Sequence, residues 1–546
     1  MRYLRWFSRV IRPYGMPFAV MILCHVAFAF CAVFFVYSCK QLVDIAVSLL
    51  NGTSDVGAMG LWLMVLVGVI LLRILLNSLK AYLQAKTEIR MKNHLRRNLF
   101  DIMLRMQSDG TRMHHTGDII NRIQEDVRVI SSAFISSVPN FIGSCLQFAA
   151  AAAFLIWLDY RLALVVVVVL PVGLGVGKYV TGRIRNLTLD IRNSDSKVQS
   201  HVQESIQHRT LLQSMEYAST SSDELEGLQD VLYAGELRRT RFSVVSRIFV
   251  SMAFQAGYLI AFMWGVLGIS HGTVTYGMMT AFLQLVGQIQ RPLLEMSAQI
   301  PSILHSTASI DRIMEIEALP QEEPVTEPIF MDSPAGIRLT DVTFAYPDSS
   351  RKILDGFSFD FAPASRTAIV GPTGVGKSTL IRLLLSLLKS QEGDIRIYND
   401  KDTNGVPVSP ATRCNLVYVP QGNSLFSGTV RDNLLMGNPE ASEQEMKTAL
   451  HTAAADFVLE LPGGLDAHCS EGGAGLSEGQ AQRIAIARAL LRPGSILLLD
   501  EFSSALDGET ETILMERLTA GLHDHTMIFI THRERVIDYC TGVLRM

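Results

Sequence analysis

Charged residues are scarce in this chain, and their overall balance is slightly acidic. Only 18% of its 546 residues are Asp, Glu, Lys or Arg, whereas 49% are hydrophobic and the mean hydropathy is +0.26. A soluble protein of this length carries more charge, so the composition argues against one. The net charge of −4 offers nothing for bulk binding of nucleic acid, which we do not expect as a partner.

Cysteines are also few, and their spacing is irregular. The seven cysteines form no CxxC motif and no other paired spacing, and no histidine accompanies them at metal-ligand distance. The sequence therefore predicts neither a disulfide scaffold nor a zinc site. We expect buried or membrane-embedded free thiols.

Long apolar runs fill the first part of the chain, up to about residue 305. Each run has nearly the length that crosses a bilayer as a helix. The first is too long for a cleavable signal peptide, so we interpret it as a membrane span. The predicted spans cover residues 16–38, 58–79, 132–157, 161–181, 246–268 and 278–299.

A linker rich in Pro and Glu follows the apolar part, and the sequence beyond it changes character. Short β-rich runs, turns and amphipathic helices then alternate, as in an α/β fold. We therefore expect a multi-domain membrane protein. Its predicted parts are an all-α six-helix transmembrane domain over residues 1–318, a linker over 319–335 and an α/β domain over 336–546.

Lys and Arg residues are concentrated in three segments: the N-terminal tail and the connections after spans two and four. The other loops are short and nearly free of them. By the positive-inside rule, both termini, the α/β domain and the two long connections are cytoplasmic, in a multi-pass protein of the cell's inner (plasma) membrane. The connections are predicted to extend the helices far into the cytosol and to reverse near 108–110 and 207–209. Residues 1–13 alternate Arg with apolar residues and predict a helix on the membrane surface.

Several polar residues interrupt the spans. Arg73 either lines a substrate cavity or extends toward the headgroups, and the sequence does not decide between these. His25 favours a hydrogen bond between helices over a ligand role. Gln284, Gln288 and Gln290 favour an aqueous cavity, because amides facing lipid are costly.

A phosphate-binding loop is the most informative motif. Residues 371–379 read GPTGVGKST, which fits G-x-x-x-x-G-K-[ST] between an apolar strand and a helix. Glycines let backbone N–H groups close around a polyphosphate at a helix N-terminus. Lys377 would contact the β- and γ-phosphates, and Ser378 would offer a hydroxyl to Mg²⁺. The nucleotide-binding residues predicted here are Gly371, Thr373, Gly374, Val375, Gly376, Lys377, Ser378 and Thr379.

Two carboxylates end a later buried strand. Residues 496–499 are Ile-Leu-Leu-Leu, and Asp500 and Glu501 follow them. Asp500 is a candidate Mg²⁺ ligand. Glu501 lies where α/β sheets place their ligands and could polarise an attacking water.

Here the sequence resembles the ATP-binding cassette (ABC) family. Segment 476–480, LSEGQ, looks like the family's signature, and Gln421 in VPQ looks like its glutamine loop. Asp507 in SALD matches the Asp loop, and His532 after a strand matches the histidine switch. Tyr346 matches the aromatic residue that stacks on adenine. Residues 115–127 are similar to the stretch after the first coupling helix of the family's six-helix exporters, so the resemblance covers nearly the whole chain.

The resemblance implies a role for each motif. Two cassettes would close head-to-tail, with Ser477, Gly479 and Gln480 of one facing the ATP held by the other. Gln421 would contact Mg²⁺ together with Ser378 and Asp500. The catalytic residues would be Glu501, His532 and Lys377, with Tyr346 and Asp507 completing the nucleotide site, and ATP and Mg²⁺ are the implied cofactors.

One cassette fused to six spans implies a half-transporter that needs a second chain. The presence of Glu501 favours a homodimer, and a heterodimer is the alternative. The expected function is ATP-driven export or flipping of a hydrophobic or amphipathic substrate, such as a lipid or drug, with membrane lipids as surroundings. An importer with the same architecture and an ATP-gated channel or regulator are the alternatives. Glu478 departs from the glycine usual in the signature, and we expect its side chain to point away from nucleotide.

Overall fold

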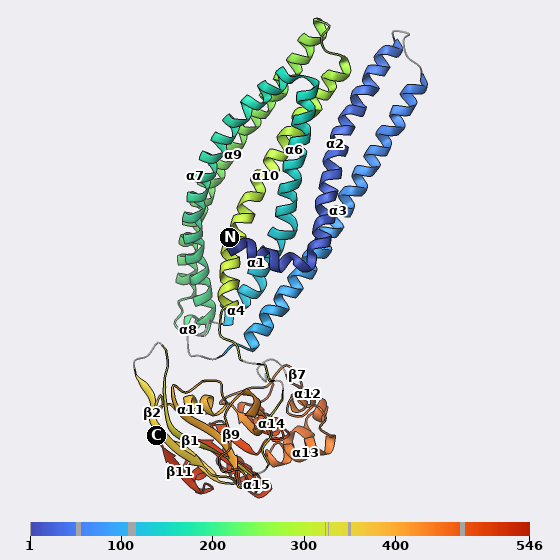
Figure 1. Cartoon of the computed structure of the whole chain (residues 1–546). Helices are drawn as coiled ribbons and strands as arrows, with labels where there is room; N and C mark the ends of the chain where they lie inside the picture. Colours follow the sequence, from blue (N-terminus) through green and yellow to red (C-terminus); the bar gives the residue numbers. More distant parts are fainter. Residues whose placement is uncertain are drawn as a thin grey trace. The chain divides into compact units, whose positions relative to one another are not determined.

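The protein forms two compact units, one of Met1–Leu99 with Ile120–Glu315 and one of Phe100–Ile119 with Ile316–Met546. The first is helical, and the second contains the β-sheets (Figure 1). The domain limits at 318 and 335 stay a prediction. The computed structural model describes residues 2–50, 56–107, 116–322, 324–325, 327–332, 334–347, 351–469 and 475–546.

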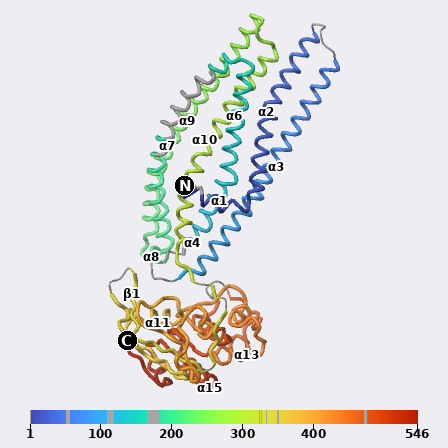
Figure 2. The backbone as a smooth tube through the Cα atoms, viewed as in Figure 1, coloured from blue at the N-terminus to red at the C-terminus, as the bar shows by residue number. Residues whose placement is uncertain are grey.

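Helices of membrane-spanning length or more occur at all six places where spans were predicted. With 21 residues at about 1.5 Å each, even α6, the shortest of the six, matches the roughly 30 Å hydrocarbon core of a bilayer. Helix α7 packs along α9, and α2 packs against α6 (Figure 2). The helices are α2 (Gly15–Leu50), α3 (Val56–Leu104), α6 (Val138–Leu158), α7 (Tyr160–Gln207), α9 (Ala218–Ser270) and α10 (Tyr276–Glu317).

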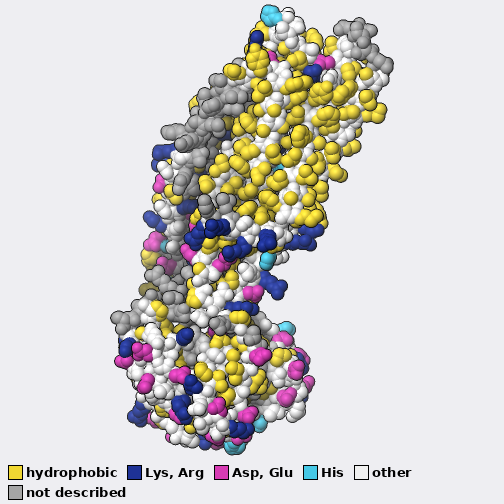
Figure 3. Space-filling model, viewed as in Figure 1, with side chains coloured by type: hydrophobic (Ala, Val, Ile, Leu, Met, Phe, Trp, Pro, Cys, Tyr) yellow, Lys and Arg dark blue, Asp and Glu magenta, His cyan; other side chains and the backbone are white. Residues whose placement is uncertain are grey.

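Four stretches of the described chain could cross a membrane by length and composition alone: Arg5–Leu50, Val56–Leu104, Ile119–Leu158 and Ala218–Ser270. Most side chains of the predicted span 161–181 lie outside the described set. Helix α10 is less apolar, because it contains two prolines, several glutamines and an Arg–Glu pair. Figure 3 shows hydrophobic side chains over α2 and α3, with Lys and Arg gathered at one end of that face.

Two π-helical turns precede α6 and separate short α-helices. The segment runs through α4 (Thr116–Asn121), η2 (Arg122–Asp126), α5 (Val127–Ser132) and η3 (Ala133–Ser137). Asp126, only 4% exposed, accepts from the guanidinium of Arg312 on α10. Arg122 donates to Glu315 at 3.2 Å. The irregular segment is therefore held against α10 by two ion pairs.

The chain reversals have clear local causes. Asp159, between α6 and α7, accepts from the backbone N–H groups of Arg161 and Leu162 and from the Trp264 indole, which fixes the predicted tight hairpin. Helix α7 ends at Gln207, and α8 (Arg209–Ser214) follows, so the position of the second predicted turn is confirmed. The first, at 108–110, lies outside the described residues.

The N-terminal helix α1 (Arg2–Ile11) forms as predicted, and its two faces differ. Trp6 is 3% exposed, and the rings of Trp6 and Phe7 pack on Phe134 at 6.1 and 4.6 Å. The arginines of the other face are exposed. This division suits a helix that lies flat at an interface.

The second unit has two main sheets. An antiparallel sheet has the order β2-β1-β4-β5, from β1 (Ala335–Ala345), β2 (Lys352–Phe361), β4 (Glu392–Asn399) and β5 (Val406–Pro407). A parallel sheet has the order β11-β3-β10-β9-β6, from β3 (Arg366–Val370), β6 (Leu416–Val419), β9 (Ile496–Asp500), β10 (Thr526–Ile530) and β11 (Gly542–Arg545). Central strands β9 and β10 are buried throughout, as continuous apolar runs in parallel sheets are.

A short tie joins the end of α3 to the segment before β1, inside the second unit. Gln107 N donates to Pro320 O at 3.0 Å, and Glu322 N donates to Arg105 O at 2.7 Å. The Glu322 carboxylate accepts hydrogen bonds from two guanidinium nitrogens of Arg413, at 2.8 and 3.0 Å. Such a bidentate pair fixes orientation as well as distance.

Candidate nucleotide site

The phosphate loop joins β3 to helix α11 (Lys377–Leu384) and requires glycine at two positions. Gly374 has φ +85° and Gly376, at the start of α11, has φ +119°, which L-residues rarely adopt. A Cβ on Gly376 would also come within 2.5 Å of Ile353 Cγ2. The loop therefore brings backbone N–H groups to a helix N-terminus, which is a ready anion site.

Lys377 points back over this loop. Its side chain is buried, and Nζ donates to the carbonyls of Gly371 at 2.6 Å and Pro372 at 3.2 Å. His532, just after β10, places Nε2 3.2 Å from the same ammonium group. The structure thus brings together two residues that are far apart in the sequence and were predicted to act together.

Glu501 stands beside them, in a strained backbone conformation. Its φ is +46°, which is uncommon for any residue other than glycine. Its N–H donates to Ile530 O at 3.0 Å, and Gln482 Nε2 donates to its carbonyl at 3.2 Å. These bonds hold the strained residue at the carboxyl end of β9.

The Glu501 carboxylate contacts two other predicted site residues. Gln421 Nε2 donates to Oε2 at 2.5 Å, and His532 Nε2 lies 3.6 Å from Oε1. A continuous line of contacts therefore runs from Gln421 through Glu501 and His532 to Lys377. This arrangement gathers groups from the ends of three neighbouring parallel strands and the phosphate loop.

Asp500 is the most deeply buried acid of this edge, with 5% exposure. Burial raises the pKa of its carboxyl group, and the adjacent charge of Glu501 raises it further. Tyr418 Oη lies 3.5 Å from Oδ2, and this contact acts in the opposite direction. Burial, followed by the charge of Asp500, raises the pKa of Tyr418 to about 12, so this hydroxyl stays a donor.

Sequence reasoning missed Tyr418, although a signal was present. The residue lies in β6, three positions before Gln421, and β6 pairs with β9 so that Tyr418 lies opposite Leu498. Parallel neighbours in a sheet bring their carboxyl ends to one edge. A polar residue near the end of that strand was therefore a candidate for contact with Asp500.

The oxygen donors of this edge fit Mg²⁺ bound jointly with phosphate. Ser378, Gln421 and Asp500 offer a hydroxyl, an amide and a carboxylate, all of which are hard ligands. The described residues include no cluster of three His, Cys, Asp or Glu side chains suited to a metal ion. A cation that takes its remaining ligands from nucleotide phosphates and water suits such a site.

Tyr346 lies close to the start of α11. Its hydroxyl is 3.1 Å from Thr379 Oγ1, and its ring meets Phe344 edge-on at 5.1 Å. An aromatic face is thereby fixed next to the phosphate loop. The contact agrees with the position predicted for a residue that stacks on adenine.

The signature residues are organised around helix α14 (Glu478–Leu490). Ser477 caps it, accepting from Gln480 N at 3.2 Å, while the Gln480 side chain accepts from Ser477 N at 2.9 Å. A Cβ on Gly479 would come within 2.7 Å of Ala505 O, so this position needs glycine. Glu478 is exposed in the first turn, where its charge suits the helix dipole.

Asp507 ends the segment after Glu501 and caps α15 (Gly508–Gly521). It accepts from Thr510 N at 2.9 Å and Glu509 N at 3.1 Å. The Thr510 backbone bond in particular lowers the pKa of this carboxyl group. In the part of the chain that the structure describes, no hydrogen bond links Ser477, Gly479 or Asp507 to the phosphate loop.

The helical unit contains a separate polar cavity of about 640 Å³ between α2, α3, α6 and α10. Arg73 lines it, which answers the question that the sequence left open. His25 also lines it, although we favoured a hydrogen bond between helices, and its buried Nε2 has no hydrogen-bond partner among the described residues. A Cβ on Gly143 would meet the His25 ring at 2.0 Å, so α2 and α6 approach closely here.

Gln284, Gln288 and Gln290 do not line this cavity, which corrects our expectation, although Gln299 of the same helix does. Gln288 donates to Ala32 O on α2 at 3.1 Å, and Gln290 donates to Phe254 O on α9 at 3.0 Å. Gln284 contacts Cys39. These amides instead tie helices together, although the buried Oε1 atoms of Gln284 and Gln288 have no hydrogen-bond partner among the described residues.

Comparisons with known proteins agree with this architecture. Residues 18–293 match the family described as ABC transporter transmembrane region, and residues 354–504 match ABC transporter. An ATP-dependent lipid A-core flippase of Aromatoleum aromaticum is 29% identical over 98% of this chain and 90% of its own length. A fatty acid ABC transporter ATP-binding/permease protein of Mycobacterium tuberculosis is 28% identical over 78% of this chain and 68% of its own length.

A solved structure shares the fold of the whole chain. It is that of a bacterial Atm1-family ABC exporter with ATP bound, and it has a TM-score of 0.78 at 23% sequence identity. The match covers 99% of this chain and 94% of the other. Helical and α/β parts therefore occur here in the same combination as in that protein.

Proposed function

Because this chain belongs to the ABC transporter family, in which an ATPase drives transport, we propose that it is one half of an exporter or flippase for amphipathic substrates. The observation that carries the proposal is the line of contacts from Gln421 through Glu501 and His532 to Lys377. A phosphate loop and a catalytic edge fused to membrane helices suit one half of a pump. Two relatives named for lipid A-core and fatty acid transport support an amphipathic substrate.

The geometry suggests how the residues divide the work. Lys377 and the loop 371–379 would neutralise the phosphates, and Tyr346 would stack on adenine. Glu501 would orient the attacking water, while His532 would contact the γ-phosphate. Ser378, Asp500 and Gln421 would hold Mg²⁺, which screens charge between the β- and γ-phosphates. Catalysis of this kind is mostly positioning and electrostatics.

A second chain completes the proposal. Ser477, Gly479 and Gln480 lie at the start of α14, where Ser477 is exposed, and among the described residues none of the three is hydrogen-bonded to the chain's own phosphate loop. Their N-terminal helix position suits contact with the ATP of a partner cassette. Glu501 is present, so two identical chains would each contribute one working site. We therefore favour a homodimer.

We place the molecule in the inner membrane, with its termini and ATPase domain in the cytoplasm. The basic side chains at one end of the apolar helical face support this orientation (Figure 3). Export and flipping then move substrate away from the side on which ATP is hydrolysed.

ATPase activity of the purified chain in lipid nanodiscs tests the catalytic part, with Lys377→Ala as the control. We expect clear Lys377-dependent turnover from this chain alone. If the chain binds ATP but does not turn it over, the homodimer is wrong and a partner chain is required.

Translocation in inside-out vesicles tests the transport part. A fluorescent amphiphile added outside should reach the lumen, or the inner leaflet, only with ATP and only with Lys377 intact. Turnover without movement of any amphiphile would overturn export and favour an ATP-driven regulator.

A further inference from the structure

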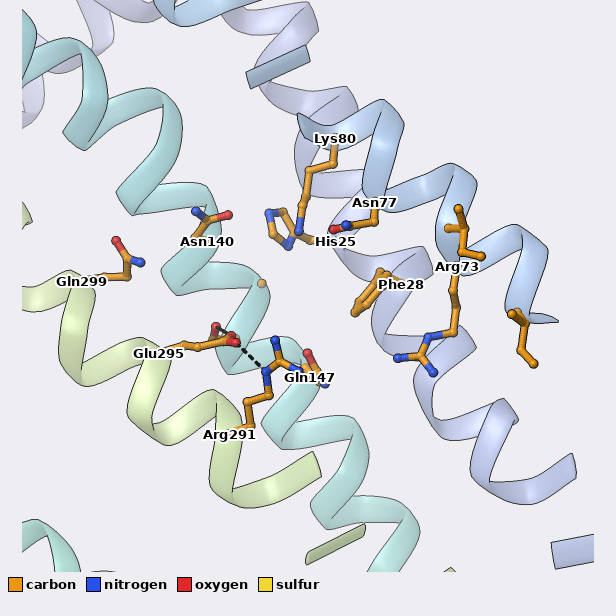
Figure 4. Close-up of a pocket in the computed structure, with 14 residues that line it drawn as sticks. His25, Phe28, Arg73, Asn77, Lys80, Asn140, Gln147, Arg291, Glu295 and Gln299 are labelled. Atoms are coloured by element: carbon orange, nitrogen blue, oxygen red, sulfur yellow. Dashed lines mark hydrogen bonds and ion pairs between the residues drawn. The ribbon is translucent and has the colours of Figure 1, made fainter. Parts of the chain in front are cut away.

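We propose that the cavity of the helical unit binds the anionic headgroup of an amphiphile, with Arg73 and Lys80 as its charge partners. This inference rests on the proposed function and names the substrate class. Figure 4 shows His25, Phe28, Asn77 and Lys80 around one side of the cavity, facing Glu295 and Arg291 on the other.

The charges that line the cavity do not balance. Three cations, Arg73, Lys80 and Arg291, face one carboxylate, Glu295. Glu295 already accepts from Arg291 at 3.0 Å and from Ser144 at 3.1 Å. Among the residues that the structure describes, the charges of Arg73 and Lys80 are therefore left without an acid in contact.

Arg73 and Lys80 contact aromatic rings instead of acids. The Arg73 guanidinium lies 5.2 Å from the Phe28 and Phe35 ring centroids, and the Lys80 ammonium lies 5.6 Å from Phe28. Neither residue forms an ion pair with any residue that the structure describes. A cation–π contact is worth about 0.5–2 kcal/mol, far less than a half-buried charge loses by leaving water. Cations kept at this depth therefore indicate an anionic ligand.

The two cations unpaired among the described residues, Arg73 and Lys80, lie on one face of α3. Arg73, Asn77 and Lys80 are four and three residues apart, so they share a helix face. With about 1.5 Å per residue, this stripe of three residues extends roughly 10 Å along the helix. It runs from within the predicted second span to its cytoplasmic end. A headgroup that enters from the cytoplasmic leaflet would meet Lys80 first and Arg73 next.

Amide and apolar groups complete the site. Asn140 accepts from Gln84 at 3.0 Å through its carbonyl oxygen, which leaves its NH₂ group as a donor, and Gln147 and Gln299 also face the cavity. Phe28, Ile70 and Ile74 supply apolar surface beside the charges. Hydrogen-bond donors for oxyanion oxygens beside an apolar surface suit an anionic headgroup attached to an alkyl chain. A volume of about 640 Å³ exceeds what a lone ion needs.

Equilibrium binding to the full chain, in phosphatidylcholine nanodiscs without ATP, tests the proposal. The probes are radiolabelled hexadecyl phosphate and its zwitterionic relative hexadecyl phosphocholine. We expect the phosphate to bind at least about tenfold more tightly, because each charged hydrogen bond is worth about 1.5 kcal/mol or more. Equal affinity for the two probes would overturn the inference.

Substitutions locate the site. Arg73→Gln and Lys80→Gln should each weaken hexadecyl phosphate binding about tenfold, and Arg73→Lys should retain most of it. Lys86→Gln is the matched control, because Lys86 is also on α3 and contacts an aromatic ring, Tyr82, but is exposed and does not line the cavity. An unchanged affinity in the Arg73→Gln/Lys80→Gln double variant, with a wild-type melting temperature, would refute the assignment.

Inorganic phosphate separates a lipid headgroup from a free oxyanion. It should compete with hexadecyl phosphate only at far higher concentration, and competition at equal concentration would overturn the amphiphile part. Because this binding needs no ATP, its result is independent of transport. Charge-dependent binding without translocation would defeat the proposed function and leave the cavity assignment standing.

Discussion

The two units hold their polar groups in different ways. In the second unit, each motif of the candidate site is held by a short segment, such as a helix cap, a left-handed glycine loop or a strand end at one shared edge. In the first unit, the cavity takes its polar groups from four long helices, and no short segment contains more than a fraction of them. The difference teaches that a chemical mechanism can be tied to local motifs, while substrate choice depends on how helices are packed.

If the chemistry depends on the local motifs of the second unit, a substitution at the catalytic edge should have the largest effect on ATP turnover. Glu501→Gln should lower turnover about 10²–10⁴-fold, because an amide cannot act as a base toward water. ATP binding should persist, and the cassettes should stay dimerised. Steady-state ATPase assays and cross-linking measure both effects. Turnover near wild type would remove Glu501 from the catalytic role.

A packing change in the helical unit should cost stability rather than chemistry. Gly143→Ala places a methyl group 2.0 Å from the His25 ring and should lower stability by about 1–3 kcal/mol. The thermal unfolding midpoint in detergent measures this loss. Gly68→Ala on α3 is the control, since nothing lies within 4 Å of its Cβ position.

His25→Ala should relieve that clash. The double variant His25→Ala/Gly143→Ala is expected to be more stable than additive losses predict, because the two sites are in contact. Strict additivity would show that the helices had already separated at this point.

Tyr418 tests whether the second unit also depends on contacts that no motif encodes. Tyr418→Phe removes a contact that lowers the pKa of Asp500, so that pKa should rise further above its usual value. If Asp500 holds Mg²⁺ as proposed, binding of the ion needs the ionised carboxylate and is lost as the pH falls through this pKa. The acid limb of the ATPase profile should therefore move to higher pH. A limb that stays in place, or moves to lower pH, would contradict the role.

The smallest effect is expected at the signature. Glu478→Gln removes a charge that is exposed on the first turn of α14. Exposed substitutions usually change free energies by no more than about 0.5 kcal/mol, so turnover should stay within about twofold. A large gain in turnover would mean that the carboxylate repels a neighbouring nucleotide.

More of the second unit's site could be predicted from the sequence than of the first unit's cavity. The strands, the phosphate loop and the acid edge follow from short apolar runs and glycines, and Lys377, Glu501 and His532 meet as expected. Six helices also follow from hydropathy. Lys80, Asn140 and Glu295 were missed as cavity residues, because which face a helix presents depends on its rotation against neighbours.

Two glutamines of α10 also show that the sequence does not determine the environment of a helix face. Gln284 and Gln288 share a helix face, and this spacing favoured an aqueous cavity. Their amides instead bond to neighbouring helices, and periodicity cannot distinguish these two environments. The i, i+4, i+7 stripe of Arg73, Asn77 and Lys80 was the available signal for the real cavity.

The tie between 105–107 and 320–322 has a consequence for biosynthesis. A ribosome releases Phe100–Ile119 long before Ile316 is made, yet these segments belong to one compact unit. Domains normally fold in the order of their synthesis, but here an early segment must wait for Glu322 and Arg413. The first helices are therefore made with an unfinished end at Phe100–Ile119, which is completed only when the C-terminal half has been synthesised.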